Sequence, residues 1–398
     1  MKKKILLLIM IFIIILGLGN CIYSKNSQLS KSEKIEDFEC LYSNVKKGYP
    51  YLYVNKRHYN VDWLENKEKY LKRIEDTPDD EKFIEEMSSI VDDLHNRHTE
   101  LIDNKSRFEL FKTAYSNNNW YDFLSDEKVL NRYNSIKPKI KIQKEYFFKK
   151  KLTLEDIIKD KVGYIYLPSM SSSEGSFNED FNKIGNYIDT LENHEALIID
   201  IRDNAGGSDS YWQGVLSKLI KEDRKVSGYR IYRNNCKTIK KYTQKRNIKL
   251  QPIKNLPEHI KKNGPKEILK QFTDFENTSY TIKGNPNLKF KGNIYLLVDE
   301  KVFSSSELFS MFCKETKFAT VIGESTGGDG GVIDPVLINL KNSGLIIRMA
   351  SCMYLDKDGI CDEELKVIPD YKIEDCEKTS NFKNDNCIKK VLEIEKLN

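Results

Sequence analysis

The sequence of 398 residues lacks the motifs of several common kinds of site. Its eight cysteines form no Cys-x-x-Cys pair, which argues against a structural zinc site. The phosphate-binding pattern Gly-x4-Gly-Lys-Ser/Thr is absent, and so is any internal repeat. The formal net charge is only +5, and Lys2, Lys3 and Lys4 supply three of these charges, so charge gives no argument for nucleic acid. We therefore expect no metal, nucleotide or other cofactor and no nucleic-acid partner.

A long apolar run occurs at the N-terminus. Residues 1–21, MKKKILLLIMIFIIILGLGNC, have a basic start, an unbroken apolar stretch and then small residues, which is the plan of a secretory signal. The ending LGLGNC resembles a bacterial lipoprotein signal, in which Cys21 becomes the lipid-bearing first residue, although Asn20 stands where a small residue is usual. An uncleaved membrane helix is the alternative. Both interpretations predict an extracytoplasmic protein anchored to the cell membrane.

Seven further cysteines are too many by one to pair completely. Cys352 with Cys361, or Cys376 with Cys387, would close short loops in an oxidising compartment. Free, partly buried thiols are the simpler interpretation.

The composition and the hydrophobic periodicity change along the rest of the chain. Two amphipathic patterns follow a polar tether, and the second predicts a helix that begins after Thr77 with Pro78 in its first turn. A polar, weakly periodic stretch comes next, before the apolar runs of the core. We expect a signal segment 1–21, a tether 22–33, an N-terminal helical domain 34–102, a connector 103–160, a core 161–375 with a basic, loop-rich insertion 222–292, and a charged tail 376–398.

Short apolar runs alternate with helical stretches in the core. They are rich in Ile, Val and Tyr, as buried strands are, and helical patterns such as 210–220 and 305–316 lie between them. This alternation predicts an α/β (α+β) fold with a mainly buried sheet flanked by helices. The predicted strands are VGYIYLPSM, ALIIDIRDNAGG, NIYLLVDE, ATVIGE and GLIIRMAS.

Three consecutive serines, Ser304, Ser305 and Ser306, lie between the predicted strand NIYLLVDE and the predicted helix SSELFSMFCKE. The first amides of a helix are unpaired and carry a partial positive charge. A hydroxyl at such a turn is well placed for nucleophilic attack, because the amides beside it can hold a developing oxyanion. Serine also caps helices very often, so the pattern alone leaves both roles open.

Two other stretches carry groups that a reactive serine needs. Adjacent glycines in IDIRDNAGG let a backbone amide approach a ligand closely, whereas Asp203 and Asp209 would repel a phosphate. LHNRHTELI places His98 just after an amphipathic helix, where it can serve as a base. A third stretch, DKDGICDEE, fails as a calcium loop because Gly359 is its fourth residue and not its sixth.

Four stretches together resemble, in the same order, the tail-specific (C-terminal-processing) serine proteases and the tricorn core protease. They are HTELI, IDIRDNAGG, FSSSELF followed by ATVIGESTGG, and VIPDYKI, and the likeness covers roughly residues 34–373. The resemblance implies that Ser304 is the nucleophile. It also implies an oxyanion hole made by the amide of Ser305 and the amide of one of the two glycines 206–207, for which we choose Gly206.

The resemblance offers two kinds of base. The tail-specific branch uses a lysine in a Phe-Gly-Lys-Gly segment, but this sequence reads Gly-Gly-Asp-Gly there and Asp329 replaces the lysine. The tricorn-like branch uses a histidine, which falls on His98, and a glutamate shortly before Pro-Asp, which falls on Glu363 or, one residue away, on Glu364. Arg97 stands where that branch has a serine. The resemblance thus implies a tricorn-like serine endopeptidase without a PDZ domain, acting on peptide or protein substrates.

A protein that binds without catalysis is the alternative. The interphotoreceptor retinoid-binding protein carries ligands on a related core, so this chain could bind a peptide or an apolar ligand. The joint presence of Ser304, His98 and Glu363 favours the enzyme.

Overall fold

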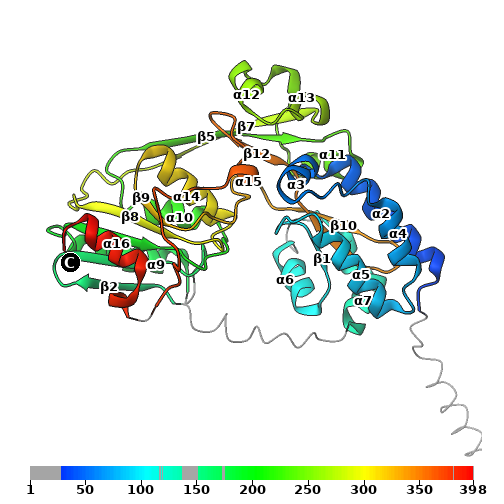
Figure 1. The fold of residues 1–398 in the computed structure, drawn as a ribbon, viewed down its shortest axis with the longest axis horizontal. Helices are drawn as coiled ribbons and strands as arrows, with labels where there is room; N and C mark the ends of the chain where they lie inside the picture. The colour runs from blue at the N-terminus through cyan, green and yellow to red at the C-terminus, as the bar shows by residue number, and fades with distance from the viewer. Residues whose placement is uncertain are drawn as a thin grey trace, which may run out of the picture.

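The computed structural model describes residues 28–115, 118, 120–136, 151–172, 175–379 and 381–397. The predicted signal segment and Cys21 lie outside these residues. No helix within the described part is both long and apolar enough to cross a membrane. Figure 1 shows two lobes, one built on a six-stranded sheet and one that contains the N-terminal helices, with long strands running between them.

The first lobe, here called the sheet lobe, is built on a sheet of order β13-β9-β8-β4-β3-β2. Its four central strands are parallel, while β2 runs antiparallel to β3 at one edge. Four of the five predicted core strands are therefore confirmed in this sheet, and β2 falls within the predicted connector. The fifth, GLIIRMAS, is a strand of a separate three-stranded sheet. The strands are β2 (Thr153–Ile158), β3 (Val162–Tyr166), β4 (Ala196–Asp200), β8 (Asn293–Val298), β9 (Thr320–Gly323) and β13 (Tyr371–Lys372).

Both faces of this sheet are buried, which explains the continuous apolar runs of its strands. Ile165 and Ile199 pack under α9 (Phe177–Thr190), α10 (Asp209–Leu216) and α14 (Ser305–Thr316). Tyr164 and Ile198 point to the other face, where they pack with the C-terminal helix α16 (Asn386–Ile394). The α/β fold with a buried, helix-flanked sheet is confirmed.

The charged tail is part of this lobe. The guanidinium of Arg202, 1% exposed, donates to Asp200 at 2.6 Å and to Asp385 at 2.8 Å. Asp385 in turn accepts the first amides of α16. Arg202 of the IDIRDNAGG motif therefore anchors the tail.

The second lobe, here called the helical lobe, contains α2 (Lys31–Gly48), α3 (Leu52–Tyr59), α4 (Lys67–Glu75) and α5 (Asp80–Asp92). Ser30 and Glu33 form a capping box at the start of α2. α5 begins later than predicted, because Asp79 caps it and the Thr77 hydroxyl donates instead to Ile74 O at 2.8 Å. Its predicted apolar face is buried as expected.

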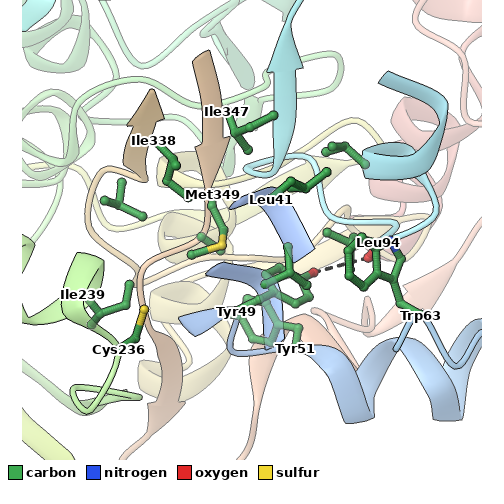
Figure 2. Packing of buried hydrophobic residues seen from close by; sticks show 14 of the residues in the cluster. Leu41, Tyr49, Tyr51, Trp63, Leu94, Cys236, Ile239, Ile338, Ile347 and Met349 are labelled. Atoms are coloured by element: carbon green, nitrogen blue, oxygen red, sulfur yellow. Dashed lines mark hydrogen bonds between the residues drawn. The ribbon is translucent and has the colours of Figure 1, made fainter. Parts of the chain in front are cut away.

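A three-stranded sheet packs beneath these helices, in the order β1 (Glu100–Ile102), β11 (Ile346–Met349) and β10 (Val336–Asn339). Figure 2 shows Leu41, Tyr49 and Trp63 packed with Ile347 and Met349. The predicted connector adds helices to the other side of this sheet, so it is a folded part of the lobe. These elements are α6 (Lys105–Tyr115), η1 (Asp122–Ser125) and α7 (Glu127–Ser135).

The insertion is also more regular than predicted. Its strands β5 (Arg224–Tyr232) and β7 (Asp274–Ile282) pair along nine residues and lie between the two lobes in Figure 1. Ile231 and Phe275 enter the core of the helical lobe, so the insertion ties the lobes together. Its other elements are α11 (Lys237–Lys245), β6 (Gln251–Pro252), η2 (Ile253–Asn255), α12 (Glu258–Asn263) and α13 (Ile268–Gln271). Outside the insertion, β12 (Met353–Asp356) pairs with β5, α15 (Asp362–Leu365) follows β12, and η3 (Phe382–Asn384) belongs to the C-terminal tail.

All seven cysteines in the described part are free thiols, and six of them are buried. The pairings Cys352–Cys361 and Cys376–Cys387 are therefore not formed in this structure.

Candidate active site

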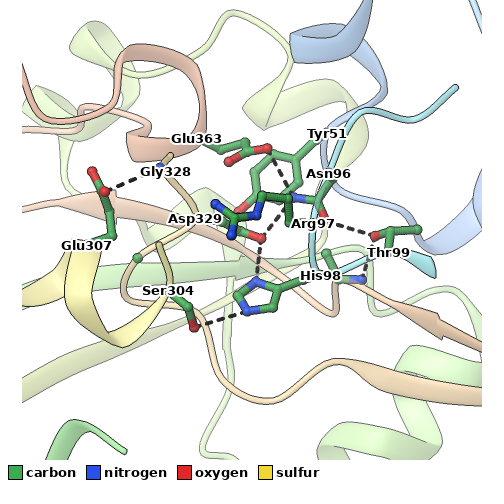
Figure 3. Close-up of polar contacts among 12 residues, drawn as sticks. Tyr51, Asn96, Arg97, His98, Thr99, Ser304, Glu307, Gly328, Asp329 and Glu363 are labelled. Atoms are coloured by element: carbon green, nitrogen blue, oxygen red, sulfur yellow. Dashed lines mark hydrogen bonds and ion pairs between the residues drawn. The ribbon is translucent and has the colours of Figure 1, made fainter. Parts of the chain in front are cut away.

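The candidate site lies where the two lobes meet, and four loops build it. Ser304 follows β8, and the 204–207 turn follows the adjacent parallel strand β4, so both lie outside the carboxyl ends of the sheet, where α/β folds place their ligands. His98 comes from the loop between α5 and β1 of the helical lobe. Asp329 comes from the 324–335 loop, which joins β9 of one sheet to β10 of the other. Figure 3 shows the side chains of Ser304, His98 and Asp329 arranged in a row.

Ser304 has a strained backbone, with φ 61° and ψ −120°, a conformation that side-chain-bearing residues rarely adopt. Its amide donates to Gly328 O at 3.1 Å, and its carbonyl accepts the amide of Leu308 in α14. Its hydroxyl makes no capping bond to α14 and instead lies 3.0 Å from Nε2 of His98. Of the two roles left open by the sequence, this geometry fits the nucleophile and not the cap.

Asn204 of the IDIRDNAGG motif holds the turn that carries Ser304 in place. Its carbonyl accepts the amide of Phe303 at 3.3 Å, and its Oδ1 accepts the hydroxyl of Ser306 at 2.6 Å. Its Nδ2 donates to Leu167 O in the next loop. Asn204 therefore fixes the position of the serine turn relative to the glycine turn.

The amides beside Ser304 differ in their availability. Gly206 N–H donates to Asn204 Oδ1 at 3.0 Å, so the amide predicted for the oxyanion hole is already engaged. The amides of Gly207 and Ser305 make no hydrogen bond to any residue that the structure describes, and both residues line the pocket that contains Ser304. Gly206 has a different role, since a Cβ there would lie 2.7 Å from Phe303 O. Among the described contacts, the amides of Gly207 and Ser305 are thus the ones left free to donate to a ligand in this pocket.

His98 is 5% exposed and contacts a carboxylate on its second nitrogen. Its Nδ1 lies 2.6 Å from Oδ2 of Asp329. An ionised carboxylate can only accept, so Nδ1 carries the proton and Nε2 is left to accept from the Ser304 hydroxyl. The row Ser304–His98–Asp329 has the connectivity of a nucleophile, a base and an orienting acid.

Asp329 is completely buried and is held by the helical lobe. Its Oδ1 accepts from the Tyr51 hydroxyl at 2.8 Å, and its Oδ2 accepts from Asn96 Nδ2 at 2.8 Å as well as from His98. Burial alone would raise the pKa of Asp329, but the charge of His98 and these hydrogen bonds bring it below its ordinary value. Asp329 is therefore ionised at neutral pH.

Glu363, predicted to support the base, does not touch His98 in the described contacts. Its Oε1 accepts from Asn96 Nδ2 at 3.0 Å, so one amide bridges Glu363 and Asp329. Burial raises the pKa of Glu363 well above its ordinary value, and the charge of Asp329 raises it further. The surroundings thus shift the pKa values of the two carboxyl groups in opposite directions: they favour the ionised form of Asp329 and the protonated form of Glu363.

The Asn96 amide that joins them is itself oriented. Its Oδ1 accepts from the Thr99 hydroxyl at 2.9 Å, and Thr99 Oγ1 accepts the amide of Ala350. This chain, visible in Figure 3, leaves the NH₂ of Asn96 facing the carboxyl groups.

Two more buried acids support the loop that carries Asp329. Glu307 accepts from the Thr326 hydroxyl and from the amides of Gly328 and Val367. Asp362 accepts the amide of Gly330 at 2.7 Å. Burial raises the pKa of Asp362 well above its ordinary value, and nearby Glu307 adds to the rise. Both acids therefore act on backbone geometry and do not contact the serine–histidine pair.

The remaining residues noted in the sequence lie elsewhere. The guanidinium of Arg97 lies 4.4 Å from the centre of the Phe303 ring and makes no hydrogen bond to His98 in the described contacts. His95 stacks on Tyr59, and the other histidines, His58, His194 and His259, are outside the site. No cluster of three or more His, Cys, Asp or Glu side chains in the described residues is placed to hold a metal ion.

Replacing Ser305 with alanine is expected to change activity by less than about threefold. Its hydroxyl is buried without a hydrogen-bond partner, whereas its useful group is the backbone amide, which alanine keeps. Steady-state kinetics and thermal unfolding of Ser305→Ala test this. A loss comparable to that of Ser304→Ala would show that the Ser305 hydroxyl takes part in the chemistry.

Comparison with known proteins identifies the family and the fold. Residues 161–373 match peptidase family S41. A structure from Parabacteroides merdae described as a peptidase has a TM-score of 0.59 and 18% identity, covering 92% of this chain and 96% of that chain. Mature CPAF complexed with lactacystin has a TM-score of 0.57 and 13% identity, covering 92% of this chain and 98% of that chain. At such identities these two structures show a shared fold. A search of curated proteins found no significant match.

Proposed function

The chain belongs to peptidase family S41, a family of serine peptidases, and on that premise we propose that it is an exported endopeptidase with Ser304 as its nucleophile. One observation carries the proposal: the Ser304 hydroxyl lies 3.0 Å from His98 Nε2, whose other nitrogen lies 2.6 Å from buried Asp329. A serine becomes nucleophilic only beside a base, and that base must be oriented.

In the proposed reaction, Ser304 Oγ attacks the peptide carbonyl while His98 Nε2 takes its proton. The oxyanion forms beside the amides of Gly207 and Ser305. His98 then gives the proton to the leaving amine, which leaves an acyl group on Ser304. Water, deprotonated by His98, attacks this ester in the same way, and Ser304 takes the proton back as the acid product leaves. Asp329 keeps Nδ1 protonated and stabilises the positive charge that His98 gains.

Glu363 has an indirect part in this scheme. It shares the amide of Asn96 with Asp329, and its raised pKa favours the neutral form, which adds no second negative charge beside that carboxylate. We therefore assign the orienting role to Asp329 and a supporting role to Glu363.

The direct test is incubation of the purified protein with a mixture of synthetic peptides, followed by mass spectrometry. New internal cleavage products from the wild type, and none from Ser304→Ala, are the expected result. Peptide binding without any cleavage by the folded wild type would favour the non-catalytic binding protein instead.

The N-terminal sequence supports an extracytoplasmic location with a lipid anchor on Cys21. Cys21→Ser is expected to abolish fatty-acid attachment and to leave an unprocessed precursor or a mis-sorted protein, because the thiol is the lipid acceptor. Metabolic labelling with a fatty-acid analogue, followed by fractionation, measures both effects. Membrane retention of a wild type that carries no fatty acid would point to an uncleaved anchor.

A further inference from the structure

One cation lines the same pocket as the proposed catalytic residues. The cavity of about 360 Å³ is bounded by Ser304 and His98 and also by Arg348. Arg348 lies on the middle strand β11, opposite Glu100 of β1 and Leu337 of β10, so its position is fixed by two strand pairings. Its side chain is 12% exposed.

The hydrogen-bonding capacity of Arg348 is largely unused. Its Nη1 donates to Glu100 Oε1 at 3.0 Å and, weakly, to Arg97 O at 3.5 Å. Its Nε is buried without a partner, and Nη2 makes no hydrogen bond to any described residue. Nε and Nη2 form the edge of a guanidinium that binds a carboxylate through two parallel bonds.

The charge of Arg348 is also only partly neutralised inside the protein. Its one carboxylate partner, Glu100, is shared with Arg107, whose Nη2 lies closer to it at 2.6 Å. Burial lowers the pKa of Arg348, and the charge of Glu100 offsets this only in part. Burying a cation whose single carboxylate partner is shared with another cation costs free energy, and a further anion beside it would reduce that cost.

The pocket holds two acids that must be weighed against this cation. Asp334 is paired with Arg246 at 2.5 Å. Asp209 lies at the start of α10 and accepts only a long bond from Trp212 at 3.4 Å. Asp209 therefore favours a positively charged ligand near the glycine turn. A test must distinguish binding of a cation by Asp209 from binding of a carboxylate by Arg348.

We propose that Arg348 is a substrate-binding residue that receives a carboxylate of the peptide beside the scissile bond. The proposal deepens the peptidase function and rests on it for the identity of the ligand as a peptide. The carboxylate can be an Asp or Glu side chain or the C-terminal carboxylate, since both present the same pair of oxygens to a guanidinium.

Cleavage profiling separates these sources. The wild type is given a library of synthetic peptides in two forms, with free and with amidated C-termini. A side-chain carboxylate predicts enrichment of Asp or Glu at one fixed position from the cut in both forms. A terminal carboxylate predicts cuts at a fixed distance from the C-terminus that amidation removes.

Arg348→Met is expected to reduce kcat/KM for the preferred peptides by about 10- to 100-fold, the effect of losing a charged hydrogen-bonded pair, with little change for neutral peptides. Arg348→Lys keeps the charge but loses the planar pair of N–H donors, so its kcat/KM for these peptides should lie between those of the wild type and Arg348→Met. Arg107→Met is the matched control: it removes the other partner of Glu100 but does not line the pocket, so the preference should persist.

A second measurement does not depend on cleavage. Ser304→Ala, with and without Arg348→Met, is titrated with acetyl-tetra-alanine as the free acid and as the amide, and with amidated versions that carry one Asp or one Asn. Tighter binding of one carboxylate form, lost with Arg348→Met, supports the proposal even if the wild type cleaves nothing. Equal binding of acid and neutral forms, a preference unchanged by Arg348→Met, or a preference for Lys that Asp209→Asn removes would overturn it.

Discussion

Ser304→Ala is expected to lower kcat/KM by about 10⁴-fold or more, since removing the nucleophile of a serine peptidase leaves only binding and oxyanion stabilisation. The variant should fold normally, because the Ser304 hydroxyl makes its one described contact with His98 and does not cap α14. Its backbone conformation, with φ 61°, is as strained for alanine as for serine, so stability should change little.

Peptide cleavage by Ser304→Ala, measured beside Ser305→Ala and with thermal unfolding of both, checks this expectation. Both variants remove one hydroxyl from the same turn, so the comparison isolates the hydroxyl that faces His98. Near wild-type turnover by a folded Ser304→Ala would assign the chemistry to another residue.

Asp329→Asn is expected to reduce kcat/KM by about 10²- to 10⁴-fold. An asparagine NH₂ at this position would face Nδ1 of His98, which could then accept from it and carry its proton on Nε2. That tautomer cannot accept the proton of Ser304. His98→Ala should cause a loss of similar size, whereas His58→Ala, His194→Ala and His259→Ala should retain activity.

Glu363→Gln makes a sharp contrast with Asp329→Asn. Glutamine has the shape of a protonated glutamate and can accept from Asn96 in the same way, so we expect a loss below about fivefold. The comparison decides which acid orients His98. A large loss in Glu363→Gln together with a small loss in Asp329→Asn would return the orienting role to Glu363.

The dependence of activity on pH follows from the same assignment. The pKa of Asp329 lies below its ordinary value, so this carboxylate stays ionised as the pH falls through the range where histidine takes up a proton. A histidine base is active only in its neutral form, so kcat/KM should fall as the pH is lowered through the range in which histidine takes up a proton. A limb near pH 8–9 would indicate a lysine base.

The core strands and the nucleophile turn could be predicted from the sequence because each is a local pattern. Ile165 and Ile199 face one side of the sheet and Tyr164 and Ile198 the other, so the strands are apolar throughout and easy to recognise. Ser304 follows such a strand and precedes an amphipathic helix. Both signals depend only on neighbouring residues.

The contacts of Asp329 could not be predicted in this way. Asp329 is separated from His98 by 231 positions and from Tyr51 by 278. No periodicity connects such positions, and a lone aspartate between glycines reads as a turn residue. The departure from lysine at this position is visible in the sequence, but it only excludes a lysine base and does not identify Asp329 as the acid beside His98.

The glycine turn illustrates a second limit. The sequence places Gly206 and Gly207 next to each other and gives no reason to choose between their amides. The choice follows from Asn204, whose side chain accepts Gly206 N–H and leaves that of Gly207 without a described partner. Side-chain orientation of this kind is set by tertiary packing.

The fluorophosphonate adduct of the wild-type protein, located by mass spectrometry after digestion, tests the central claim most directly. The reagent reacts only with a serine that is activated by a base and held beside oxyanion donors. The account predicts one adduct, on Ser304, that is absent from Ser304→Ala and strongly slowed in His98→Ala. An adduct on another serine, or no adduct on the folded wild type, would contradict it.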